Sequence, residues 1–214
     1  MRRFVRGVIA VLLFLAGAAH AAGQEPPPPI GPFVLDAHGT VPRFPNDVQL
    51  SQSRNLSPSE LPGVGLGLHA GVHVYPFRWR SITFGLGADL TLARAHRAPP
   101  PGPTGERAVT ERFAHVAPQL SFNFGTGNGW SYLSGGIGPS VWSLGAANEP
   151  TRDADVERLR TLNYGGGARW FLNAHLAFSL DVRFYAINPG TPAHGLPGSP
   201  RTTLFFIGAG LSIK

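Results

Sequence analysis

The chain has 214 residues, of which only 14% are charged, and it carries a formal net charge of +6. It contains no cysteine, which excludes disulfide bonds, thiolate metal sites and acylation of a cysteine behind a secretory signal. Its length, less a removable N-terminal segment, fits one domain rather than two.

The N-terminus has the features of a cleavable signal peptide, which we assign to residues 1–21. Arg2, Arg3 and Arg6 precede an apolar stretch, and Ala19-His20-Ala21 provides a small-x-small cleavage site. Removal of this segment takes three of the 18 basic residues and none of the 12 acidic residues, so the net charge falls to +3. So small a charge gives no support for a nucleic-acid partner. The proline-rich residues 22–32 are predicted to form an extended periplasmic tether.

From residue 33 to the end, apolar residues recur at every second position, which is typical of strands. Between Val64 and Val74 the even positions are all valine, leucine or alanine, whereas the odd positions are glycine or histidine. A helix would lose about 1 kcal/mol for each of these glycines. Eight segments show such alternation: 33–41, 64–77, 81–93, 113–125, 130–143, 161–171, 176–186 and 203–214.

The predicted connections alternate between short and long. Short ones lie at 78–79, 125–129 and 172–174. The long ones are polar or proline-rich and lie at 44–62, 96–111, 145–159 and 188–200. An even number of strands with this alternation is typical of bacterial outer-membrane barrels. We therefore expect residues 33–214 to form an all-β, eight-stranded antiparallel up-and-down transmembrane β-barrel with short periplasmic turns and long extracellular loops.

One face of each predicted strand is apolar and free of charge, and we expect it to meet lipid. The opposite face is small and rich in glycine, which suits the narrow interior of an eight-stranded barrel. Charged groups in such an interior need partners, so a lumen network of hydrogen bonds and ion pairs is predicted. Its candidate members are Asp36, His38, His69, His73, Asp89, His115, Arg169, Asp181 and Arg183.

Aromatic residues gather beside the short connections, as expected for an interfacial girdle. Its candidate members are Tyr75, Phe77, Trp79, Phe122, Phe124, Trp130, Tyr132, Trp170 and Phe171. Basic residues near the long connections alternate with acidic ones, which predicts solvated loops rather than a phosphate-binding face. These basic residues are Arg94, Arg97, Arg107, Arg112, Arg152, Arg158 and Arg160.

The spacing of His69 and His73 would suit a zinc ion on a helix. On a strand the two residues stand about 13 Å apart, at roughly 3.3 Å per residue, so the pair cannot clamp one ion. A turn near residue 79 predicts cross-strand partners whose numbers add to about 158, which places Asp89 opposite His69. Asp36 or His38 is expected to approach His69 from the other side.

Within the same lumen network, Arg169, Asp181 and Arg183 are expected to form a second cluster. Enzyme chemistry has less support. His96 and His194 lie near the predicted rim, but neither has an evident serine and acid at a matching height. No catalytic residue, cofactor or metal site is therefore assigned.

These features resemble the small outer-membrane β-barrel proteins of Gram-negative bacteria, the class that includes the OmpA transmembrane domain and OmpX. The C-terminal GAGLSI, with Gly208, Leu211 and Ile213, is similar to the signal that the barrel-assembly machinery reads in that class. Ile213 replaces the usual terminal aromatic residue, and Lys214 follows it. The resemblance implies an outer-membrane location, a monomer, and contacts with outer-membrane lipid, lipopolysaccharide and the assembly machinery.

Two non-enzymatic functions remain open at this point. One is a structural or surface-interaction role through the extracellular loops, with 97–107 and 148–160 as candidate contact segments. The other is a narrow pore or carrier for small solutes. A lipid A-modifying enzyme is a third and less well supported reading, because the serine and acid it needs are not evident.

Overall fold

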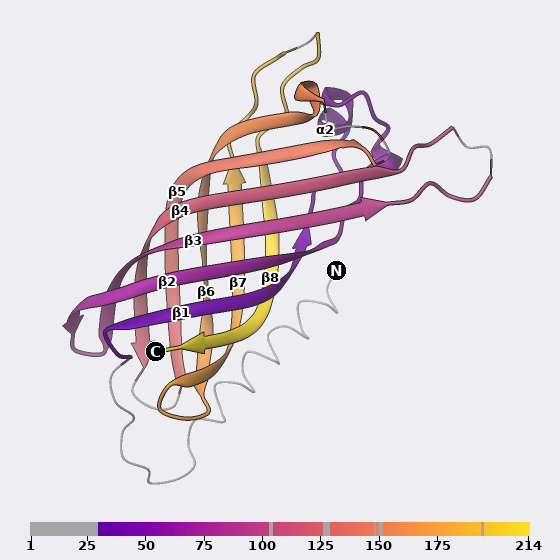
Figure 1. The fold of residues 1–214 in the computed structure, drawn as a ribbon. Coiled ribbons are helices and arrows are strands. Elements are labelled where there is room, and N and C mark those ends of the chain that lie inside the picture. Colours follow the sequence, from indigo (N-terminus) through magenta and orange to yellow (C-terminus); the bar gives the residue numbers. More distant parts are fainter. Residues whose placement is uncertain (1–29, 103–104, 126–128, 148, 150–151, 194) are drawn as a thin grey trace, which may run out of the picture.

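The computed structural model is a closed barrel of eight antiparallel strands, each paired with its neighbours along the chain, with the first paired to the last (Figure 1). The structure describes residues 30–102, 105–125, 129–147, 149, 152–193 and 195–214, and the predicted signal peptide lies outside them. The strands are β1 (Phe33–Arg43), β2 (Gly65–Trp79), β3 (Ile82–Arg97), β4 (Val109–Gly125), β5 (Gly129–Ala146), β6 (Val156–Phe171), β7 (Leu176–Ile187) and β8 (Thr202–Ile213). The predicted all-β, eight-stranded antiparallel up-and-down barrel is confirmed.

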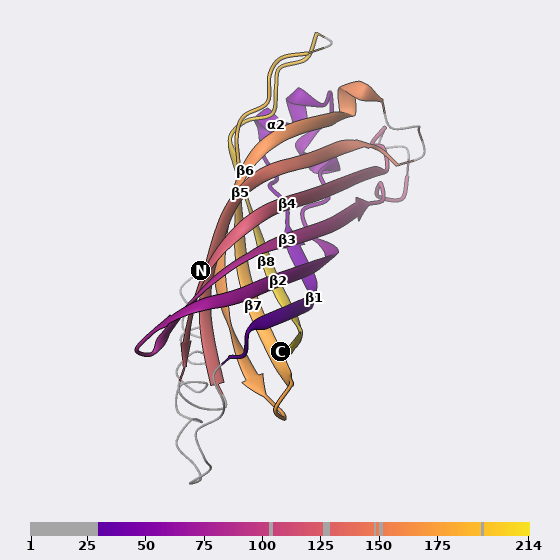
Figure 2. The ribbon, with the colours of Figure 1, turned by 60° about the vertical axis from the view of Figure 1, so that its left-hand side comes forward.

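The connections differ in length at the two ends of the barrel. Residues 80–81, 126–128 and 172–175 join strands at one end, which we call the turn end. Residues 44–64, 98–108, 147–155 and 188–201 join them at the other, the loop end. The short helices α2 (Val48–Ser53), η2 (Pro58–Glu60) and η3 (Asp153–Asp155) belong to the loop end, and the C-terminus lies at the turn end (Figure 2).

Over most of their length, the strands point their two faces as the alternation predicts. Large apolar side chains of one phase are exposed on the outside, and Leu66 and Leu68 retain 74% and 66% of their surface. Side chains of the other phase are buried in the barrel interior. In water such an exposed apolar wall would be unfavourable, whereas a lipid-facing wall needs it. Among the described residues, no helix is both long enough and apolar enough to cross a membrane.

The predicted register between β2 and β3 is wrong by two residues. His69 lies opposite Thr91, and Asp89 lies opposite Gly71. The turn begins later than expected, at residue 80, and the register also shifts between Val74 and Phe77. Such a bulge cannot be located by counting back from a turn.

The bulge also changes which aromatic residues face lipid. Pro76 lies at the irregularity, where its missing N–H costs no ladder hydrogen bond, so Tyr75 points inward and Phe77 outward. Trp130 and Tyr132 are likewise buried in the lumen. These three buried residues were wrongly predicted to belong to the girdle, whereas Phe77, Trp79, Phe122 and Phe124 are exposed on the outside.

Several strands extend further towards the loop end than the sequence suggested. Arg94, Arg112, Arg158 and Arg160 belong to β3, β4 and β6, and their side chains are exposed in the outward-facing phase. The prediction that they lie in solvated loops is wrong, because the two-residue alternation continues through them. The outer wall therefore carries positive charge near the loop end.

One ladder of the barrel is interrupted. Strands β4 and β5 pair from Val109 to His115 and again from Leu120 to Gly125, without a change of register. Residues 116–119 and 136–139 do not pair with each other, although they pair with β3 and β6 on their other sides. Pro118 and Pro139 lie in these segments and have no N–H to donate. At Gly136, an added Cβ would collide with the carbonyl oxygen of Pro118, so the two backbones approach closely even where pairing is lost.

Candidate functional site

The candidate site is the interior of the barrel, together with the loops that cover it. All nine sequence-predicted lumen residues are buried, none with more than 6% of its surface exposed. They come from six strands, because each strand contributes only its inward phase: Asp36 and His38 (β1), His69 and His73 (β2), Asp89 (β3), His115 (β4), Arg169 (β6), and Asp181 and Arg183 (β7). Their contacts form two connected groups.

The first group lies towards the turn end and centres on Arg169. Its guanidinium donates to both carboxylate oxygens of Asp36, at 3.0 and 2.7 Å, and to Asn123 Oδ1 at 2.8 Å. Ser212 also donates to Asp36. The guanidinium carbon lies 3.9 Å from the centroid of the Tyr132 ring. This bidentate pair spans the lumen between β1 and β6, which are not neighbours in the sheet.

The second group surrounds Arg183. Arg183 donates to Asp181 at 3.2 Å and to Ser134 at 2.9 Å, and its Nη1 lies 3.6 Å from Asp89 Oδ2. Tyr132 donates from its hydroxyl to Asp181 at 2.7 Å. The prediction that Arg169 clusters with Asp181 and Arg183 is therefore wrong for Arg169, which pairs with Asp36 instead.

His69 has two polar neighbours in the lumen. Although its ladder partner is Thr91, its Nε2 lies 3.5 Å from Asp89 Oδ2, reached diagonally across β2 and β3. On its other side His38 is the direct partner in β1, with the two Nδ1 atoms 3.3 Å apart and the rings stacked. Both approaches expected from the sequence thus occur, the first by a diagonal route.

Asn163 connects Asp89 to β4. Its amide nitrogen lies 3.1 Å from each Asp89 oxygen and 2.8 Å from His115 Nε2, while its oxygen accepts from Gln119 at 2.7 Å. His115 in turn donates from Nδ1 to the Pro139 carbonyl oxygen, at 3.0 Å. His115 thereby bonds across the gap in the β4–β5 ladder.

Sequence reasoning passed over several members of the network. Tyr132 contacts both groups, and Asn123, Asn163 and Ser212 supply hydrogen bonds to the charged residues. The alternation in the sequence does place the two asparagines on the inward face of their strands. Tyr132 was hidden because an aromatic residue beside a turn is equally typical of a girdle.

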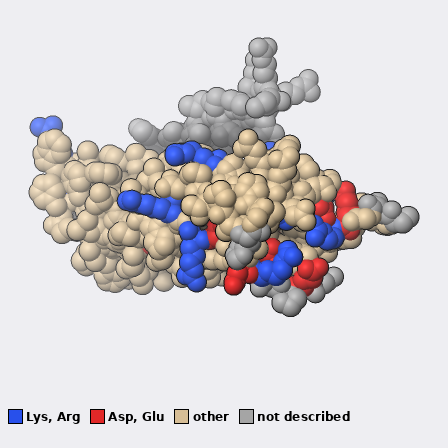
Figure 3. Space-filling model, turned by 90° about the horizontal axis from the view of Figure 1, so that it is seen from above, with Lys and Arg blue, Asp and Glu red and all other residues tan. Residues whose placement is uncertain are grey.

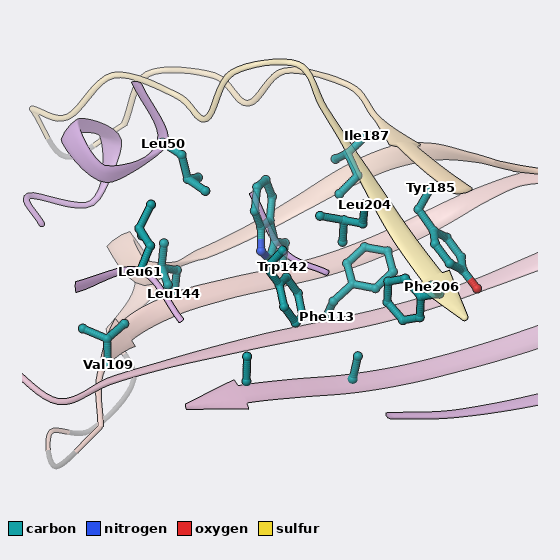
Figure 4. Packing of buried hydrophobic residues seen from close by; sticks show 13 residues of the cluster. Leu50, Leu61, Val109, Phe113, Trp142, Leu144, Tyr185, Ile187, Leu204 and Phe206 are labelled. Carbon is teal, nitrogen blue, oxygen red and sulfur yellow. The ribbon is translucent and has the colours of Figure 1, made fainter. Parts of the chain in front are cut away.

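Above the polar network, towards the loop end, most side chains in the lumen are apolar (Figure 4), although Glu111 is buried there and accepts a hydrogen bond from Trp142 at 2.8 Å. Phe113, Tyr185 and Phe206 pack with ring centroids 4.8 to 6.1 Å apart. Further buried members of this cluster come from strands β3, β4, β5, β7 and β8 and from the segment 44–64: Phe44, Leu50, Leu61, Ala93, Ala95, Val109, Trp142, Leu144, Ile187 and Leu204. We call this set the apolar plug.

Loops are tied to one another over the plug. Glu60 accepts hydrogen bonds from the Ser57 backbone at 2.7 Å and from the Arg107 backbone at 2.9 Å, which joins segment 44–64 to segment 98–108. Although burial raises the pKa of Glu60, these hydrogen bonds outweigh it and lower the pKa to about 2. Arg54 similarly pairs with Glu157 at 2.7 Å.

The turn end of the lumen is closed by a smaller apolar group. Ile30 is 1% exposed and packs with Val34, Tyr75 and Trp130. Ile30 belongs to the range predicted as a periplasmic tether, so the described end of that range is packed into the barrel. Residues 22–29 of the predicted tether lie outside the described residues.

No group of three or more histidine, cysteine or acidic side chains in the described part of the chain is arranged to hold a metal ion. His96, considered as a rim residue for enzyme chemistry, lies 3.2 Å from Thr110 Oγ1 through its Nδ1. His194 lies outside the described residues.

The closed eight-stranded antiparallel barrel is the fold of the small outer-membrane β-barrels. The crystal structure of Neisserial surface protein A (NspA) matches with a TM-score of 0.56 and 12% identity, over 86% of this chain and 97% of NspA. Ail, the attachment invasion locus protein of Yersinia pestis, in complex with a heparin analogue, matches at 0.49 and 10%, over 85% and 96%. The outer membrane protease OmpT from Escherichia coli matches at 0.43 and 10%, over 91% and 99%. No protein-family model and no curated protein matches by sequence.

Proposed function

We propose that the chain is an integral outer-membrane barrel with a structural or surface-interaction role, exerted through the loop end rather than by conduction or catalysis. The observation that carries the proposal is the filled lumen. A bidentate pair between Asp36 and Arg169 crosses it, and the apolar plug lies above. Ions moving through such an interior would have to break buried ion pairs and enter an apolar region.

The closed sheet and its apolar outer face support the membrane location. Away from the arginines near the loop end, the outward phase is apolar, and the sheet has no open edge because β1 pairs with β8. A closed barrel satisfies backbone groups without water, as the interior of a bilayer requires. NspA, which shares the fold, is described as a surface protein, and the same location is proposed for this chain.

The loop end supports the interaction role. Hydrogen bonds and ion pairs join segments 44–64, 98–108 and 188–201 to one another or to the barrel rim. Loops held in this way present a defined surface, and little ordering entropy is lost when a partner binds it. The long loops are proposed to lie outside the cell and the short turns in the periplasm.

Gel mobility and cell fractionation test the location. The detergent-extracted protein is expected to migrate differently before and after boiling, because a closed barrel resists unfolding by detergent, and to co-fractionate with outer membranes. Identical mobilities together with a soluble periplasmic pool would overturn the proposal.

Epitope insertion tests the orientation. A tag placed after Gly102, in the segment 98–108, should be bound by antibody on intact cells. The matched control is the same tag placed after Arg80, at the turn end, which should be bound only after the outer membrane is permeabilised. The reverse result would contradict the proposed surface role.

Planar bilayers test the remaining alternative of a narrow pore or carrier. The purified barrel is expected to be electrically silent. Discrete conductance steps that change when Arg183 or Asp89 becomes alanine would establish conduction through the lumen and overturn the structural reading.

A further inference from the structure

Acidic residues and loop-end arginines lie on opposite faces of the strands. All five acidic residues in the strands lie in the inward phase: Asp36, Asp89, Glu111, Glu157 and Asp181. Five arginines occupy the outward phase near the loop end: Arg43, Arg94, Arg112, Arg158 and Arg160. Figure 3 shows basic side chains spread over an otherwise uncharged surface, with the acidic ones mainly gathered towards one side of the molecule. The outer wall therefore favours a negatively charged partner.

Two of these arginines are direct neighbours. Arg94 on β3 is the ladder partner of Arg112 on β4, and Ser143 on β5 is the next partner in the same row. Directly opposite side chains have Cβ atoms about 5 Å apart, and like charges at that distance repel. Among the described residues, no acidic side chain forms an ion pair with either arginine. An anion placed between the two guanidinium groups would offset their repulsion.

An apolar groove lies beside this basic pair. It is an open depression of about 810 Å³ on the outside of β1 to β5. Leu92, Ala114 and Val141 line the groove. They form the next outward-facing row of ladder partners towards the turn end from Arg94 and Arg112. Leu66 and Leu68 on β2 flank it. The small side chain of Ala114 leaves the hollow between larger neighbours, and its lining suits a hydrocarbon chain.

The depth of the pair in the wall also suits a lipid headgroup. Arg94 is three residues from the last residue of β3, and Arg112 is three residues from the first residue of β4. That separation corresponds to about 10 Å along each strand. Arginine on the lipid face is unfavourable at the bilayer midplane but tolerated near the interface, where its long side chain reaches the headgroups.

We propose that Arg94, Arg112 and the groove beneath them form a binding site for a phosphorylated glycolipid of the outer leaflet, namely the lipid A part of lipopolysaccharide. Its phosphate would lie between the two guanidinium groups, which can each donate two hydrogen bonds to phosphate oxygens. One acyl chain would lie along Leu92, Ala114 and Val141. The site rests on the proposed outer-membrane location, because that is the membrane whose outer leaflet supplies this lipid.

Native mass spectrometry of the full-length barrel in detergent tests the site directly. Wild-type protein is incubated with bisphosphorylated lipid A, with enzymatically dephosphorylated lipid A, or with phosphatidylglycerol. We expect retention of the phosphorylated lipid A to exceed that of either other lipid by at least about tenfold, because two guanidinium groups and an acyl groove are engaged together. Equal retention of dephosphorylated lipid A would overturn the role of the phosphate, and equal retention of phosphatidylglycerol would overturn the choice of lipid.

Variants locate the site on the barrel. R94Q/R112Q should lose most lipid A retention, and A114F should reduce it by filling the groove while keeping both charges. The matched control, R78Q/R80Q, removes two exposed arginines from the turn end and should retain lipid A as the wild type does. Equal loss in the control, or full retention in R94Q/R112Q, would contradict the assignment.

Heat-dependent gel mobility is recorded for each variant. If R94Q/R112Q does not form a barrel, A114F and the three-lipid comparison on wild-type protein still decide the proposal. A wild-type barrel that fractionates with the outer membrane but shows no preference for phosphorylated lipid A would refute the site alone. A soluble wild-type protein would refute the proposed location and the site together.

Discussion

At the scale of the residue, buried ion pairs link the strands across the lumen, and each charged group depends on its partner. Three carboxylates and two guanidinium groups are buried together, and each lies within 4 Å of an opposite charge. Buried pairs of this kind add little stability over a well-packed apolar core, but removal of one partner leaves an uncompensated charge. The network therefore specifies which side chains may occupy the interior.

Substitution of Arg169 by methionine is expected to lower the free energy of unfolding by about 3–5 kcal/mol, because Asp36 then remains buried without its partner. Urea titration of the barrel in lipid vesicles, followed by tryptophan fluorescence, measures the change. The double variant D36N/R169M should recover part of the loss, since both charges are removed. A double variant as unstable as the sum of the two single variants would contradict the pairing.

At the scale of the element, glycine sets how closely the strands can approach. Gly87 on β3 is opposite His73, and an added Cβ there would collide with the Val72 carbonyl oxygen and the His73 ring. At Gly71 on β2, the nearest atom to an added Cβ lies at 3.7 Å, an ordinary contact. The two glycines share the inward phase but differ in how much room surrounds them.

G87A is therefore expected to destabilise the barrel by about 1–3 kcal/mol through overpacking. G71A, the matched control, should change stability by less than about 0.5 kcal/mol. The same urea titration compares the two variants. If G71A proves as harmful as G87A, the cost belongs to strand composition in general rather than to the close approach at Gly87.

The alternation in the sequence predicted the number of strands, their order and the lipid-facing phase, because a period of two fixes the face of every residue on a strand. It did not predict the bulge at Pro76, which moved Tyr75 and Phe77 to opposite faces. Nor could it join Asp36 to Arg169, 133 positions away, since contacts across the lumen depend on how the closed sheet is staggered. The outward Arg94 and Arg112 were missed because charged residues beside a loop are usually solvated.

At the scale of the whole molecule, the lumen is closed at three levels. Ile30, Tyr75 and Trp130 fill the turn end, the ion pairs occupy the middle, and the apolar plug fills the loop end. Segment 44–64 contributes Phe44, Leu50 and Leu61 to the plug. Closure at several heights means that the loss of one level leaves the others in place.

Replacement of residues 45–63 by a four-residue glycine-serine turn is therefore expected to leave planar bilayers silent, because the ion pairs of Arg169 and Arg183 still cross the lumen. The shortened barrel should keep its heat-dependent gel mobility, since strand pairing does not use the removed segment. Conductance steps after the replacement would locate the seal in segment 44–64 alone.

The interrupted ladder between β4 and β5 has a mechanical consequence. Apart from the bulge at Pro76 in β2, the other ladders are continuous. Between residues 116–119 and 136–139, side chains such as His115, bonded to the Pro139 carbonyl, link the two strands instead. Thermal breathing of the wall is therefore expected to concentrate along this line, where separating the two strands breaks few backbone hydrogen bonds. We therefore expect amide protons beside this seam to exchange with water sooner than those of the fully paired strands, and any stretching of the cylinder by membrane tension to begin there.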